Sequence, residues 1–237
     1  MRAAAEPQPA ETIHPRRRAL FWPVLRTMLL AAVLAYAFRA FIAEPYSVPS
    51  ASMAPTILPG DHLLVEKWAY GYNAHSLPFA KGDLSFSLGG DLPERGDVVV
   101  FADPNGGERY FVKRVIGLPG DTLSGRSDGS VILNGQPLAD AGERLDLTET
   151  LPDGRRFHVR DSIEDGPLDR FDTVHVPVGH LFVLGDNRDQ SEDSRVGRER
   201  GGFGLVPVEY VVGRAAFILL PAPSPSGERF ARLGRIQ

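Results

Sequence analysis

The sequence predicts a mostly β protein, in which an antiparallel sheet with a smaller inserted subdomain is preceded by one N-terminal transmembrane helix. A single strongly apolar stretch lies near the N-terminus. After Glu44-Pro45 the chain changes to short runs rich in Val, Ile, Leu and Phe that alternate with turn signals, and these runs are typical of antiparallel strands. With 237 residues, 43% of them hydrophobic, the chain can bury a core.

The apolar stretch, residues 19–43, predicts the transmembrane helix. A helix of about 25 residues would reach about 37 Å, which is enough to cross a bilayer. Residues 1–18 are polar and end in three arginines, and residues 1–50 hold six arginines against three glutamates. Because positive charge before a span favours the cytoplasm, we expect a cytoplasmic tail at 1–18 and an exported C-terminal body.

Two alternatives remain for the apolar stretch. One is a cleaved secretory signal peptide, since Ala35-Tyr36-Ala37 has the spacing of a processing site. The other is a buried core helix, against which the flanking arginines argue. The net charge of −4 gives no reason to expect nucleic acid. The absence of cysteine excludes disulfides, thiol nucleophiles and cysteine-ligated zinc.

Residues 44–222 are predicted to form the β body. Seven runs are expected to be strands: His62–Glu66, Asp97–Phe101, Tyr110–Ile116, Val131–Leu133, Thr173–Val176, His180–Leu184 and Val211–Leu220. Asp103–Gly106 predicts a turn, and Asn134-Gly135 predicts a two-residue hairpin. Residues 139–172 are charged and irregular, and we interpret them as an insertion.

The end of the chain, residues 223–237, is predicted to be a tail beyond a linker rich in proline and serine. Phe230, Leu233 and Ile236 recur at every third residue among arginines. This spacing would suit a short surface helix on lipid, although a frayed terminus is the simpler expectation.

Two segments contain candidate catalytic residues. Ser52 lies in the segment 49–56, where Pro49 and Pro55 restrict the backbone on either side. Lys113 lies among apolar residues in the run 110–116, and strand alternation places it on one face with Phe111 and Val115. Loss of hydration there would lower the pKa of the lysine, which would suit a base that takes a proton from serine.

Two other segments need separate interpretation. Gly185–Arg195 is a polar loop, and its acidic residues lack the spacing of a calcium loop, so we expect a hydrogen-bonded turn. Gly125–Gly129 matches the G-x-S-x-G pattern around Ser127. That nucleophile elbow needs a helix after it, whereas a strand is predicted to follow, so we interpret the match as a hairpin turn.

Taken together, these segments resemble type I signal peptidases, or leader peptidases, of the serine–lysine class. The resemblance covers about residues 38–122 and 174–220, in the order in which the family has its motifs. The matching segments are Pro49–Thr56, Gly60-Asp61, Val65–Lys67, Arg95–Phe101, Val112–Asp121, Gly185–Arg188 and Asp193–Arg195. The segment between the two regions is variable in the family. Phe111 stands where some relatives have tyrosine, and some relatives have two membrane segments.

The resemblance implies a role for each candidate residue. Ser52 would be the nucleophile and Lys113 the general base, with Ser191 orienting the lysine amine. The backbone N–H of Ser52 and the hydroxyl of Ser50 would form the oxyanion hole. Asp193 and Arg195 would pair to shape the loop behind Ser191. No metal or cofactor is expected.

By the same resemblance, the protein would be a membrane-bound endopeptidase that removes signal peptides with small residues before the cleavage site. Membrane lipid would be a further partner. Two alternatives are a non-enzymatic exported β module released from a cleaved signal peptide and a self-cleaving repressor-type protease. The first does not explain three matching motifs, and the second requires DNA-binding helices that have no counterpart here.

Overall fold

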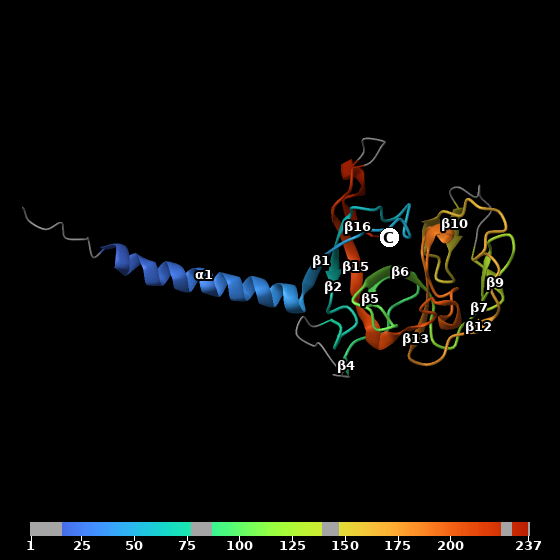
Figure 1. Cartoon of the computed structure of the whole chain (residues 1–237), viewed down its shortest axis with the longest axis horizontal. Helices are drawn as coiled ribbons and strands as arrows, with labels where there is room; N and C mark the ends of the chain where they lie inside the picture. The colour runs from blue at the N-terminus through green and yellow to red at the C-terminus, as the bar shows by residue number, and fades with distance from the viewer. Residues whose placement is uncertain (1–15, 77–86, 139–146, 224–228, 237) are drawn as a thin grey trace, which may run out of the picture. The chain divides into compact units, whose positions relative to one another are not determined.

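The computed structural model describes residues 16–76, 87–138, 147–223 and 229–236, in two compact units. The first unit ends at Arg39 and contains most of helix α1 (Arg16–Phe41) (Figure 1). Within the described residues, Phe21–Phe41 is the one helical segment long and apolar enough to span a membrane.

The predicted end of the apolar helix at Ala43 is wrong by two residues. Helix α1 ends at Phe41, and strand β1 (Ala43–Ser47) begins two residues later. Proline disfavours helical backbone in the residue before it, and Glu44 precedes Pro45. The ladder between β1 and β2 (His62–Glu66) then holds the segment extended. Hydropathy alone could not locate this change.

The second unit is built on an eight-stranded antiparallel sheet in the order β1-β2-β15-β5-β6-β13-β14, with β16 paired to β15. Its remaining strands are β5 (Val98–Ala102), β6 (Tyr110–Gly117), β13 (His180–Leu184), β14 (Val206–Pro207), β15 (Val211–Leu220) and β16 (Gly234–Arg235). The five strands of this sheet that the sequence predicts are confirmed: β2, β13 and β15 have the expected bounds, and the bounds of β5 and β6 differ by one residue.

The central strand β5 is buried on both faces, which fixes the orientation of β6 beside it. Val98 and Val100 belong to one apolar cluster, together with Met53 from the loop after β1. Val99 and Phe101 belong to a second cluster on the other face. Alternate side chains of β5 therefore pack into different apolar cores, one on each face of the sheet.

A smaller subdomain is present as predicted, but it extends beyond the predicted insertion at 139–172, because its strands begin at Thr122 and end at His175. It contains a four-stranded sheet in the order β12-β7-β8-β9 and a separate hairpin, β10–β11 (Figure 1). Its strands are β7 (Thr122–Gly125), β8 (Val131–Leu133), β9 (Gln136–Pro137), β10 (Leu147–Thr150), β11 (Arg156–Val159) and β12 (Val174–His175). The predicted turn at Asn134-Gly135 joins β8 to β9, with positive φ at both residues. Ser127 lies in the turn between β7 and β8, as expected for a hairpin.

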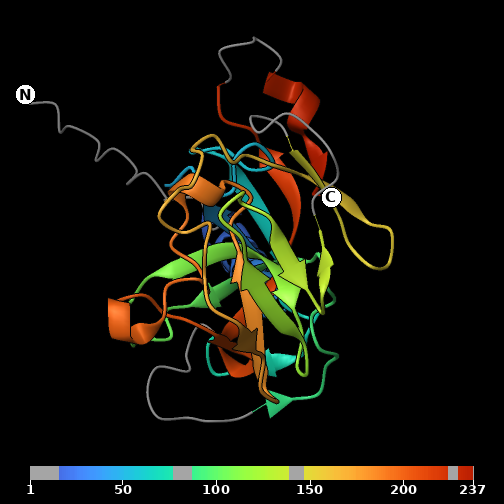
Figure 2. The same ribbon diagram turned by 90° about the vertical axis from the view of Figure 1, so that its right-hand side faces the viewer.

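The insertion is more regular than the sequence indicated. Strands β10 and β11 pair antiparallel, and Phe157 and Val159 are buried in a core shared with Phe182 of β13. In a strand of four residues, the alternation of apolar and polar side chains is too short to be recognised among charged neighbours. Part of the predicted insertion, residues 139–146, lies outside the described residues. Figure 2 shows the hairpin beside the four-stranded sheet.

The tail contains neither a frayed end nor a lipid-binding helix within residues 229–236. After a 3-10 turn (Arg229–Arg232), β16 pairs with β15, and Ile236 packs against the cluster that contains Met53. Arg232 binds the buried Asp61 carboxylate with N–O distances of 2.6 and 2.8 Å.

A separate two-stranded ladder joins β3 (Tyr72–Asn73) to β4 (Ser87–Leu88).

Candidate active site

Ser52 lies in a closed loop that follows strand β1. The loop is closed at its base, because Val48 N–H donates to the Asp61 carbonyl at 3.0 Å and Gly60 N–H donates to the Val48 carbonyl at 2.7 Å. Met53 and Ile57 anchor it in an apolar core. This backbone holds the Ser52 hydroxyl in one place with only 6% of the residue exposed.

Lys113 reaches the serine from strand β6. The lysine stands opposite Val99 of β5, and Phe111 and Val115 on either side of it pack into the same apolar cluster. Its Nζ lies 2.6 Å from Ser52 Oγ, and the residue is 3% exposed. The sheet thus brings together two residues that are 61 positions apart in the sequence.

Burial lowers the pKa of Lys113 to about 8, although the nearby Asp193 and Asp186 carboxylates oppose this shift. Desolvation disfavours the ammonium form, and the apolar neighbours on β6 offer no compensating dipoles. About a tenth of the amine is therefore neutral at pH 7, and the neutral share rises steeply up to pH 8. In that form it can accept a proton from the serine hydroxyl.

Activity should accordingly rise with pH through a group of pKa about 8. The neutral amine is the working form, so kcat/KM should fall about tenfold per pH unit well below this value and level off above it. A pH profile of kcat/KM for a model preprotein measures this. An acid limb governed by a group that titrates near pH 4 would contradict it.

The two groups predicted to form the oxyanion hole both lie in the loop of Ser52. Ser50 Oγ lies 3.3 Å from Ser52 Oγ. Within the described part of the chain, the backbone N–H of Ser52 donates no hydrogen bond. Their role in stabilising an oxyanion stays a prediction.

The predicted third serine, Ser191, is buried beside these residues. A methyl group built on Gly185 would collide with both Ser191 Oγ and the Ser52 carbonyl, so Gly185 packs between the two serines. Among the described atoms, no partner meets the geometry of a hydrogen bond to Ser191 Oγ, although this hydroxyl lies close enough to the Asp193 carboxylate to help lower the pKa of that group. The structure therefore places Ser191 near the pair without a bond to the Lys113 amine.

The loop 185–195 also holds the backbone of the serine loop. Asn187 N–H donates to the Ser52 carbonyl at 3.0 Å, and its side chain donates to the Ala51 carbonyl at 3.1 Å. Asp193 and Arg195 pair through N–O distances of 2.9 and 3.0 Å. Burial alone would raise the pKa of Asp193, but the Arg195 guanidinium outweighs burial and lowers it. The expectation of a hydrogen-bonded turn is confirmed.

The sequence did not identify the buried ion pair behind the site. Arg114 binds Asp186 in a bidentate contact, with N–O distances of 2.9 and 2.7 Å, and lies 4.4 Å from the centre of the Phe157 ring. Thr56 Oγ1 donates to the same carboxylate at 2.6 Å. The sequence did contain one sign of this ion pair: Arg114 follows Lys113 in an otherwise apolar strand, and an arginine that is buried needs a carboxylate partner.

A serine hydroxyl on a fixed loop, beside a buried amine of lowered pKa, has the geometry that a serine hydrolase with a lysine base requires. The sequence matches the family described as signal peptidase, peptidase S26, over residues 21–220. The chain therefore belongs to this family of serine endopeptidases.

Two relatives compared by sequence agree with this assignment. The chain is 36% identical to signal peptidase I of Rickettsia canadensis over 215 residues, which cover 81% of this chain and 77% of the relative. It is 38% identical to signal peptidase I of Rickettsia felis over 208 residues, which cover 79% and 75%. A crystal structure of a signal peptidase I from Enterococcus faecalis is 30% identical, with a TM-score of 0.34 over 52% of this chain and 97% of that one. The family assignment speaks against a non-enzymatic module and a repressor-type protease.

Proposed function

We propose that this protein is a membrane-bound endopeptidase that removes signal peptides from exported preproteins, with Ser52 as nucleophile and Lys113 as general base. The distance of 2.6 Å between Lys113 Nζ and Ser52 Oγ carries the proposal, together with the burial of the lysine. The names of the relatives supply the substrate class.

In the proposed reaction, Ser52 Oγ attacks the scissile carbonyl while its proton passes to the neutral amine of Lys113. The backbone N–H of Ser52 and the hydroxyl of Ser50 stabilise the resulting oxyanion. The Lys113 ammonium then gives the proton to the leaving amine, which breaks the C–N bond and leaves an acyl group on Ser52. Water, deprotonated by Lys113, hydrolyses the ester. Asp193 and Arg195 shape the loop that carries Ser191, which would orient the amine in the complex with substrate.

Helix α1 would anchor the enzyme in the bacterial cytoplasmic membrane with residues 1–18 in the cytoplasm. The apolar segment Phe21–Phe41 has the required length and composition. Arginines gathered before it favour this orientation. The catalytic unit would then lie at the outer face, where exported preproteins emerge.

Protease added outside intact spheroplasts should digest the chain from about Glu44 onward and leave residues 1–18 intact. Immunoblotting with antibodies against each end would follow both parts. Complete protection of the region after Glu44 would mean that the orientation is reversed. Mass analysis of the native N-terminus separates the anchor from a signal peptide cleaved after Ala37.

The substrate would bind as an added strand along β1. Among the described strands, β1 ends the order of the large sheet and pairs only with β2, which leaves its other edge for a substrate strand. No charged residue lies between Glu44 and Asp61, and Pro45 and Pro49 stiffen the approach to Ser52. Because alternate side chains of a strand point to the same face, the first and third residues before the cleaved bond would both point into the enzyme.

Cleavage should therefore require small side chains at these two positions. The purified full chain in detergent would be tested on a model preprotein in which each position is changed to Gly, Ser, Leu, Phe or Lys. We expect Gly and Ser to be accepted within about tenfold, and larger groups to reduce kcat/KM by more than the 10- to 200-fold effect of a methylene in a fitted pocket. Efficient cleavage after Leu or Lys would refute the substrate assignment even if Ser52 and Lys113 proved catalytic.

A further inference from the structure

The inserted hairpin contacts the loop 185–195 through a buried ion pair. Glu149 of β10 and Arg188 join through two N–O contacts of 2.6 Å, and each side chain is 3% exposed. The carboxylate and the guanidinium meet in a bidentate contact, which fixes both position and orientation. A segment that the family resemblance leaves unexplained therefore supplies a buried charge next to the candidate active site.

Contacts continue from Arg188 to the serine loop. Arg188 Nε donates to the Gly185 carbonyl at 3.2 Å, and Gly185 packs between Ser191 and the Ser52 carbonyl. The residue before Arg188, Asn187, donates its N–H to that same Ser52 carbonyl at 3.0 Å. Only one residue and one hydrogen bond thus separate the ion pair from the backbone of Ser52.

The hairpin segment holds the loop through its backbone as well. Arg160 N–H donates to the Asp186 carbonyl, and Arg188 N–H donates to the Arg160 carbonyl, each at 2.8 Å. These two bonds align Arg160 with Asn187 in a short parallel bridge. The Glu149 carboxylate adds the charged part of this contact, and it neutralises a buried arginine whose other side-chain bond is to the Gly185 carbonyl.

We propose that Glu149 is a positioning residue: through Arg188 it holds the loop 185–195 in the conformation that fixes Ser52 and Ser191 for the reaction. The inference rests on the proposed function of Ser52. A loose loop would let the Ser52 carbonyl and the Ser191 hydroxyl move, and a misplacement of about 1 Å can cost about 100-fold in rate. Substrate binding along β1 would change little, since no described contact of Glu149 lies on that strand.

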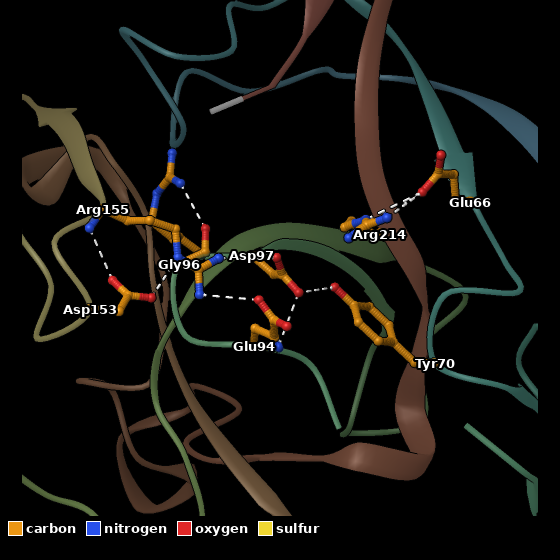
Figure 3. Close-up of polar contacts among 9 residues, drawn as sticks. Glu66, Tyr70, Glu94, Gly96, Asp97, Asp153, Arg155 and Arg214 are labelled. Carbon is orange, nitrogen blue, oxygen red and sulfur yellow. Dashed lines mark hydrogen bonds and ion pairs between the residues drawn. The ribbon is translucent and has the colours of Figure 1, made fainter. Parts of the chain in front are cut away.

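The same hairpin provides a matched control. At its turn, Asp153 accepts a hydrogen bond from Arg155 Nε at 2.7 Å, and the carboxylate is 44% exposed. Figure 3 shows Arg155 between Asp153 on one side and Glu94 and Asp97 on the other, in a cluster that also includes Tyr70. Asp153→Asn therefore makes the same chemical change as Glu149→Gln on the same hairpin, at an exposed pair.

The test compares kcat and KM of the full chain in detergent for these two variants. We expect Glu149→Gln to lower kcat about 10- to 100-fold while KM stays within about threefold. Asp153→Asn should leave both unchanged. A folded Glu149→Gln variant with unchanged kcat would overturn the proposal. Ser52→Ala is measured in the same assay to test the proposed function by itself. If Ser52→Ala is active, the proposed function fails; if it is inactive, the result for Glu149→Gln decides the role of Glu149.

A double variant distinguishes positioning from stability. In Glu149→Gln the buried Arg188 loses its partner and Tm should fall, whereas Glu149→Gln/Arg188→Met removes the unpaired charge and should recover most of the lost Tm. If Glu149 positions the loop, kcat of the double variant stays low, because the Arg188 contact with the Gly185 carbonyl is also gone. Recovery of kcat together with Tm would show a structural role only and would overturn the inference.

Discussion

Ser52→Ala should abolish preprotein cleavage, lowering kcat/KM by about 10⁴-fold or more, and Lys113→Met should do the same. The first variant removes the attacking oxygen. The second keeps an apolar chain of similar length but removes the amine that lies 2.6 Å from that oxygen. Among the described residues, neither Ser52 nor Lys113 belongs to an ion pair, and the bond of the amine is to the serine hydroxyl. Both variants should remain folded.

The control for these variants is Ser127→Ala. Ser127 lies within the G-x-S-x-G match, but it occupies the turn between β7 and β8, away from Lys113. Its kcat/KM should equal that of the unchanged protein. Circular dichroism and the thermal transition of each variant check the fold. A folded Ser52→Ala variant with normal turnover would refute the proposed nucleophile.

Asp186→Asn should give the largest loss of stability, about 3–5 kcal/mol in the free energy of unfolding. The substitution leaves Arg114 buried without its carboxylate, and Thr56 Oγ1 loses a charged acceptor. Both Arg114 and Asp186 are almost completely buried, so solvent cannot replace the lost interaction. Urea denaturation of the full chain in detergent would measure the change.

An exposed acid provides the matched comparison for Asp186. Glu199 pairs with Arg200 at 3.6 Å, and both side chains are more than half exposed. Glu199→Gln should change the free energy of unfolding by no more than about 1 kcal/mol. Equal effects of the two substitutions would show that the Arg114–Asp186 pair is not structurally important.

Five strands of the large sheet could be predicted from the sequence, because they are apolar runs of five or more residues between clear turns. The short strands β14 and β16 and the polar strand β1 could not. His62–Glu66 and Val211–Leu220 have the bounds expected from the pattern. Strands of the insertion were missed, because β10 and β11 have only four residues each and carry polar side chains on one face. Pairing between distant segments, such as β16 with β15, left no local signal.

The residues of the candidate site also differ in whether the sequence could predict them. Ser52 and Lys113 could be predicted because they lie in motifs with a family resemblance, and the structure brings them together. Glu149 could not be predicted, since a glutamate in a charged segment looks like a surface residue. Its role depends on Arg188, which is 39 residues away in the sequence. A buried charge becomes visible only when its partner and its loss of solvent are both known.

The most direct test of the account compares Ser52→Ala, Lys113→Met and the double variant for kcat/KM on one preprotein. If a single proton passes from Ser52 to Lys113, the two residues act as a unit, and the double variant should lose about as much activity as either single variant. Losses that multiply, so that the double variant is slower by the product of the two single effects, would mean that serine and lysine act independently. That result would contradict the central claim.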